Sequence, residues 1–98
     1  MKKGIYTVYD TKGTFYLDTF LKENNETAIR EFGIILSQNN NLFSTYPQDF
    51  TLFKVGWFDT KDGTITPVKE SVCNGVECLA WKNKELGEPQ LKAADGAK

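Results

Sequence analysis

The clearest hydrophobic pattern in the chain lies between residues 46 and 68. Residues 50–58, F-T-L-F-K-V-G-W-F, are mainly aromatic or β-branched, the residue types that favour strands. The sequence D-T-K-D-G follows at residues 59–63, where Gly63 can adopt a positive φ, and residues 64–66 form a return segment. Pro67 lacks a backbone donor and is expected to end that return. The pattern predicts a β-hairpin.

A second strand-forming pattern stands near the N-terminus. Residues 5–9, I-Y-T-V-Y, are β-branched or aromatic throughout and predict a strand. The sequence D-T-K-G at residues 10–13 resembles the turn of the later hairpin, and residues 14–17 predict a returning strand. Phe20 and Leu21 form a further apolar anchor.

The segment between the two strand regions has helical periodicity. Asn24 and Asn25 are both suited to cap a helix N-terminus, and the helix is expected to run to about Gln38. Its apolar face carries Ala28, Ile29, Phe32, Ile35 and Leu36. Gly33 costs about 1 kcal/mol relative to alanine in a helix, which suggests close approach of a neighbouring strand. The asparagines at residues 39–41 are expected to end the helix, because asparagine tolerates the left-handed conformation.

The order of these elements predicts an α+β fold, β-β-α-β-β, with one helix packed on a mostly antiparallel sheet. Residues 1–68 are expected to form this core domain. Residues 69–81 show no clear pattern and are expected to form an irregular extension, and residues 82–98 a disordered tail.

The central strand is apolar on both of its faces. One face carries Phe50, Leu52, Lys54, Gly56 and Phe58, and the other carries Thr51, Phe53, Val55 and Trp57. Gly56 favours the first set as the helix-facing one, because a missing side chain admits a close helix, whereas Lys54 favours the second. A single helix covers only one face. The other face is therefore expected to be covered by the segment at residues 79–81, by a second copy of the chain or by a ligand.

Charge and length narrow the classes of partner. The 98 residues are enough for one domain, and 12 basic against 13 acidic residues give a net charge of -1, without the basic excess of a protein that coats nucleic acid. Lys2 and Lys3 are not followed by a long apolar run, and no stretch is long enough to span a membrane. We expect a cytosolic protein.

The sequence lacks the residues of common catalytic and metal sites. It contains no histidine, and it shows no phosphate-binding loop or calcium-binding pattern. Cys73 and Cys78 alone do not complete a zinc site and, without a secretory context, are expected to be reduced thiols. We expect no enzyme activity, no cofactor and no metal.

Aromatic residues interleaved with lysines are the candidate site for nucleic acid. Single-strand binders use flat rings for base stacking and cations for phosphates. The candidate contact residues are Lys2, Lys3, Tyr6, Lys12, Tyr16, Lys54 and Trp57. Packing of these rings in a core or a dimer interface is the alternative interpretation.

Three motifs resemble a known family. They are I-Y-T-V-Y-D at residues 5–10, A-I-R-E-F at residues 28–32 and P-Q-D-F-T-L-F-K-V-G-W-F-D at residues 47–59. In order and spacing they are similar to the small nonstructural protein of gokushovirus-type microviruses, bacteriophages with circular single-stranded DNA genomes. The family usually carries an acidic residue in place of Trp57, which implies that this side chain points away from the helix. The resemblance covers residues 5–68.

The resemblance implies a DNA-associated protein that helps the change from duplex replication to single-strand production and packaging. It assigns no contact residues. The resulting hypothesis is a non-enzymatic phage protein that binds single-stranded DNA in the cytoplasm of the bacterial host, as a homodimer. The alternative is a protein-interaction module that docks a host or viral protein through the same apolar sheet face.

Overall fold

The computed structural model describes residues 1–86 as an antiparallel sheet with helices packed against it, which confirms the predicted α+β class. The elements in chain order are β1 (Lys2–Asp10), β2 (Phe15–Tyr16), β3 (Phe20–Lys22), α1 (Asn25–Leu36), α2 (Leu42–Thr45), the 3₁₀ turn η1 (Pro47–Asp49), β4 (Phe50–Asp59), β5 (Ile65–Asn74) and α3 (Gly75–Leu86).

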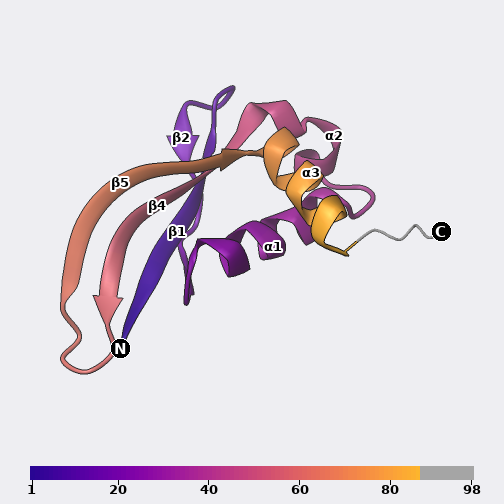
Figure 1. The fold of residues 1–98 in the computed structure, drawn as a ribbon. Helices are drawn as coiled ribbons and strands as arrows, with labels where there is room; N and C mark the ends of the chain where they lie inside the picture. The colour runs from indigo at the N-terminus through magenta and orange to yellow at the C-terminus, as the bar shows by residue number, and fades with distance from the viewer. Residues whose placement is uncertain (87–98) are drawn as a thin grey trace.

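β1 and β4 form the centre of the sheet. The strand order is β2-β1-β4-β5, and β3 pairs with β1 beside β2, so that two short strands share one edge. Figure 1 shows β4 and β5 as long curved strands, with α1 and α3 on the same side of the sheet. The predicted β4 and its turn are confirmed, and Gly63 has the expected positive φ of 76°.

The core lies between α1, α3 and one face of the sheet, which we call the helix face. Its fully or nearly buried apolar residues are Tyr6, Val8, Ala28, Phe32, Leu36, Phe50, Leu52 and Cys78. Of the predicted apolar stripe, Ala28, Phe32 and Leu36 are buried and Ile29 packs against them, whereas Ile35 is only half-buried. Gly33 is also buried in α1.

A β-bulge at Val55 changes which face of the sheet the later side chains of β4 point to. Tyr6 pairs with Lys54 and Ile5 pairs with Gly56, which leaves Val55 as an extra residue in β4. Because a bulge changes the alternation of side chains along a strand, Gly56 lies on the same face as Ile5, and Trp57 lies on the helix face. Neither set expected from simple alternation therefore stays on one face, and the expectation that Trp57 points away from the helix side is wrong.

Asparagines begin and end the helices. Asn24 is the N-cap of α1 and forms a capping box with Thr27, whereas Asn25 is the first helical residue. Asn40 adopts the left-handed conformation after α1, as expected for this segment, with a φ of 63°. Asn41 then caps the short helix α2, its side chain accepting a hydrogen bond from the backbone N–H of Ser44.

The segment after residue 66 is more regular than expected. Pro67 does not end the return strand, because β5 is an edge strand and an outward-facing position tolerates the missing donor. The expected irregular extension is instead the second half of β5 and the start of α3, and residues 82–86 of the expected tail belong to α3. The rest of that tail, residues 87–98, lies outside the described residues.

The two cysteines form a disulfide, so the expectation of free thiols is wrong. Cys73 at the end of β5 and Cys78 in α3 are bonded, with their Cα atoms 5.9 Å apart. Both flank Gly75, where a Cβ would collide with the carbonyl oxygen of Pro47. The strand therefore passes into α3 through a glycine that contacts η1 closely, and the disulfide bridges that passage.

Candidate nucleic-acid interface

The sheet face opposite the helix face, which we call the open face, is covered by no helix within the described residues (Figure 1). The register of β1, β4 and β5 places mainly apolar side chains on it. They include Ile5, Tyr9, Phe53, Phe58 and Ile65. The largest exposed fraction among these belongs to Ile65, at 61%. Of the three alternatives for covering this face, the segment at residues 79–81 is ruled out, because it belongs to α3 on the helix face.

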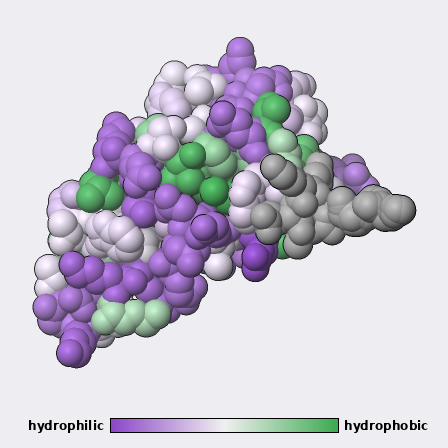
Figure 2. Space-filling view, viewed as in Figure 1, coloured by the Kyte–Doolittle hydropathy of each residue, from purple (hydrophilic) through white to green (hydrophobic). Residues whose placement is uncertain are grey.

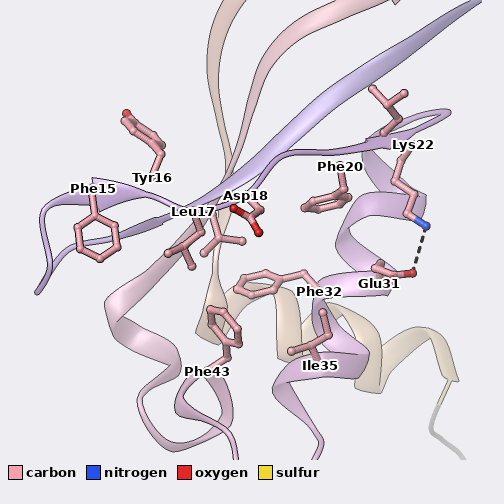
Figure 3. Close-up of a pocket in the computed structure, with 12 residues that line it drawn as sticks. Phe15, Tyr16, Leu17, Asp18, Phe20, Lys22, Glu31, Phe32, Ile35 and Phe43 are labelled. Carbon is pink, nitrogen blue, oxygen red and sulfur yellow. Dashed lines mark hydrogen bonds and ion pairs between the residues drawn. The ribbon is translucent and has the colours of Figure 1, made fainter.

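Three aromatic rings gather on the open face, and we call them the ring cluster. Tyr16 of β2 lies beside Tyr9 of β1, with ring centroids 4.7 Å apart, and meets Phe53 of β4 edge-on at 5.5 Å. Tyr9 and Phe53 are also in edge contact at 6.3 Å. The side chain of Tyr16 is 40% exposed, and Figure 3 shows it directed away from Phe32 and Phe43 of the helix side. The sheet therefore holds one ring of the cluster out to solvent.

Lys69 adds a positive charge to the ring cluster. Its Nζ lies 5.2 Å from the centroid of the Tyr16 ring, a cation–π contact across β1 and β4. Hydrogen bonding to Tyr16 and electrostatic interaction with that side chain raise the pKa of Lys69. Lys69 was missed from the sequence, because residues 65–74 lack the alternation that would have indicated a strand.

Two of the predicted contact residues are buried on the helix face. Tyr6 is 0% exposed, and its hydroxyl donates to Asn25 Oδ1 at 2.7 Å. Burial, with smaller effects of Glu70 and Glu26, raises the pKa of Tyr6 to about 12. Lys54 is 6% exposed, and its Nζ lies 3.8 Å from Glu70 Oε1. A buried ring cannot stack on a base, and a buried, paired ammonium is poorly placed for a phosphate.

Trp57 covers Lys54 rather than standing free. The Lys54 Nζ lies 4.2 Å from the centroid of the Trp57 ring, so one face of the indole is occupied by a cation. Lys2 lies beside Trp57 in a small hollow at the hairpin end, together with Asp59 and Asp62. Hydrogen bonding from Thr64 lowers the pKa of Asp62. Figure 2 shows that this end of the molecule, at lower left, is mainly hydrophilic.

The remaining predicted lysines lie at opposite ends of β1. Lys3 forms an ion pair with Glu23, with Nζ and Oε2 3.8 Å apart, and Lys12 is exposed in the turn between β1 and β2. The two ends of β1 are roughly 25 Å apart at about 3.3 Å per residue. The fold therefore divides the predicted residues between two faces and two ends. Only Tyr16 belongs to the ring cluster.

The open face combines aromatic and cationic groups. It offers an exposed ring, two further rings that hold it in place, and one ammonium group. Within residues 1–86 no group of three or more cysteine, aspartate, glutamate or histidine residues is placed to hold a metal ion. Among the described helices, none has the length and apolar character needed to cross a membrane.

Comparison with known proteins places the chain in a phage family. The family model described as Phage ORF5 protein matches residues 3–78. Protein ORF5 of Chlamydia phage 1 is 34% identical over 71 residues, which cover 68% of this chain and 74% of that protein. No solved structure matches the chain. The family match extends past residue 68, where the resemblance from motifs ended, through β5 into α3. The chain belongs to the Phage ORF5 protein family, the small microvirus-type phage proteins that its motifs resemble.

Proposed function

We propose that this phage protein binds single-stranded DNA through the ring cluster and Lys69 on the open face. The observation that carries the proposal is the geometry at Tyr16, an exposed ring supported by two others with an ammonium group 5.2 Å from its centroid. Stacking of a base on an aromatic side chain contributes about 1–3 kcal/mol and tolerates any base, because every base has a flat face. Lys69 supplies the charge for a neighbouring phosphate.

The proposed role is non-enzymatic and needs no cofactor. It is DNA binding in genome replication or packaging, in the cytoplasm of the bacterial host, as the resemblance to the microvirus family implies. We further propose that the protein acts as a homodimer. Within residues 1–86, one copy offers one ring cluster with one cation beside it, and a second copy would double the number of bases and phosphates contacted.

The test is the affinity of a fluorescent single-stranded oligonucleotide, measured by anisotropy over a range of salt concentrations. Binding should strengthen as salt falls, because phosphate contacts release counterions. Tyr16→Ala should weaken binding about 5- to 100-fold, and Lys69→Gln should reduce its salt dependence. Tyr46→Ala is the matched control, since Tyr46 is exposed but lies outside the ring cluster. No affinity at low salt, or equal losses for Tyr16 and Tyr46, would refute the proposal.

A protein partner on the same face is the second candidate. It is favoured by the exposed aliphatic side chains of Ile65 and Leu21 and by the net charge of -1. Capture from host lysate treated with nuclease separates the two candidates. A protein that stays bound after nuclease treatment, and is lost on Ile65→Lys but not on Lys69→Gln, would support this second function.

A further inference from the structure

A second hollow lies on the helix side of the sheet edge, and we call it the edge groove. Its volume is about 790 Å³, within the range of sites that enclose a ligand or several side chains. The segment from β2 to β3 forms one wall, and α1 and α2 form the other (Figure 3). The apolar side chains that line it include Phe15, Leu17, Phe20, Phe32, Ile35 and Phe43.

The floor of the edge groove is held rigid by the core. Phe43 meets Phe50 edge-on with centroids 4.7 Å apart and Phe32 at 5.9 Å, and Phe20 stacks on Tyr6 at 5.9 Å. These contacts fix the rings before any occupant arrives. A preformed apolar surface loses little conformational freedom on binding, which favours affinity.

The strand-side wall is fixed as well. The buried Thr7 donates its hydroxyl to the carbonyl oxygens of Leu17 and Asp18, at 2.7 and 3.2 Å. The backbone N–H of Leu17 donates to the carbonyl oxygen of Val8 at 2.9 Å. These bonds hold the segment between β2 and β3 against β1, and they set where the side chain of Asp18 emerges at the rim.

The rim of the edge groove has an excess of negative charge. Lys22 Nζ lies 3.1 Å from Glu31 Oε1, so these two charges largely cancel. The carboxylate of Asp18 has no hydrogen-bond or ion-pair partner among the described residues. One cation and two anions at the rim sum to -1 (1 − 2 = −1). Such a rim repels a phosphate backbone and attracts a cation.

Neighbouring residues of β2 separate this groove from the open face. Phe15 is 53% exposed and lines the groove, whereas Tyr16 contributes only to its edge and directs its ring away from Phe32 and Phe43 (Figure 3). Alternate residues of a strand face opposite sides of a sheet. The groove can therefore be altered at Phe15 and the open face at Phe53, since each of these residues belongs to one surface alone.

We infer that the edge groove binds a peptide segment of a partner protein, one that presents two aromatic or large aliphatic side chains next to a lysine or arginine. The apolar side chains fill the hollow between the two walls. The basic residue pairs with Asp18 at the rim. This inference does not depend on DNA binding at the open face.

The test uses matched fluorescent hexapeptides on the full chain. Each peptide carries two apolar residues chosen from phenylalanine, leucine, tryptophan and methionine. In one set these residues are flanked by lysines, and in the other set the same residues are flanked by glutamates. The lysine set should contain binders at least 10-fold tighter than their glutamate counterparts. Asp18→Lys should reverse this preference, and Phe15→Ala should weaken binding of the lysine set about 5-fold or more.

Ile65→Ala is the control variant, because Ile65 is exposed on the open face and does not line the edge groove, so its truncation should leave peptide affinity unchanged. Chemical-shift changes on peptide addition should map to Ile35 and Phe43. The inference is overturned if no peptide of either set binds up to millimolar concentration, or if charge makes no difference. It is also overturned if a single-stranded oligonucleotide, rather than a peptide, shifts the resonances of Ile35 and Phe43.

Discussion

The hydroxyl of Tyr6 on β1 donates a 2.7 Å hydrogen bond to Oδ1 of Asn25, the first residue of α1. The bond joins a fully buried ring at the centre of the sheet to the helix N-terminus. Asn25 Nδ2 also lies 3.5 Å from Glu70 Oε2, and Glu70 pairs with Lys54. One polar network therefore links β1, α1, β4 and β5 around a ring that the sequence suggested as a DNA contact.

Tyr6→Phe should change how stability depends on alkaline pH. The pKa of Tyr6 is about 12 in the folded protein and 10 in the unfolded chain. The neutral hydroxyl of Tyr6 therefore contributes fully to the free energy of unfolding below pH 10, and this contribution is lost between pH 10 and 12. Two pKa units correspond to about 3 kcal/mol as an upper limit. The variant should be about 1–2 kcal/mol less stable at pH 7, because it leaves Asn25 without its donor, and the difference should shrink towards pH 12.

Urea unfolding at intervals from pH 8 to 12 measures this difference. Tyr46→Phe, at an exposed tyrosine, is the matched control and should follow the wild type throughout. A gap between wild type and Tyr6→Phe that stays constant up to pH 12 would contradict the assignment.

The ion pair between the buried Lys54 and the exposed Glu70 leads to a prediction in which substitutions of the two partners have different effects on stability. Lys54→Met should change stability by less than about 1 kcal/mol, because a linear apolar side chain can fill the space under Trp57 without a desolvated charge. Glu70→Ala should cost about 1–2 kcal/mol, because it leaves a buried ammonium without its carboxylate. Chemical denaturation of both variants and of the double variant at pH 7 tests this. If the double variant is as unstable as Glu70→Ala alone, the loss does not come from the unpaired Lys54.

The elements that sequence predicted well are those fixed by local chemistry. Asn24 with Thr27 forms a capping box, and Gly63 supplies the positive φ of the hairpin turn, so the start of α1 and the end of β4 lie close to their predicted positions. In the turn between β1 and β2, Thr14 has the positive φ and Gly13 does not. Residue type alone would have favoured the glycine for this conformation.

The features that sequence missed depend on pairing between distant segments. The bulge at Val55 arises from the pairing of β4 with β1, and without this bulge Trp57 would lie on the open face. Pro67 is compatible with a strand only because β5 lies at the sheet edge. Lys69 joins the ring cluster because β5 continues past that proline, so the candidate site could not be assembled before the strand order was known.

Reduction of the Cys73–Cys78 disulfide should destabilise the protein moderately. The bond closes a loop of only six residues, for which the chain-entropy relation gives about 2 kcal/mol. Denaturation with and without a phosphine reductant measures the difference, and mass spectrometry after alkylation reports the redox state. The variant Cys73→Ser with Cys78→Ala should match the reduced wild type and should not respond to reductant. A stability unchanged by verified reduction would show that the bond contributes nothing to the fold.

Gly75→Ala should destabilise the junction between β5 and α3. A Cβ at this position would collide with the carbonyl oxygen of Pro47 in η1, a backbone atom that cannot rotate away as a side chain would. We expect a loss of about 2–3 kcal/mol, comparable to overpacking a core. Gly63→Ala is the comparison variant, because a Cβ at residue 63 would meet no atom within 4 Å. Only the positive φ disfavours alanine there, and we expect a loss of stability of about 1 kcal/mol. Thermal unfolding of both variants ranks the two costs. A smaller loss at residue 75 than at residue 63 would mean that η1 moves aside freely, and that the close contact between Pro47 and Gly75 does not hold α3 in place.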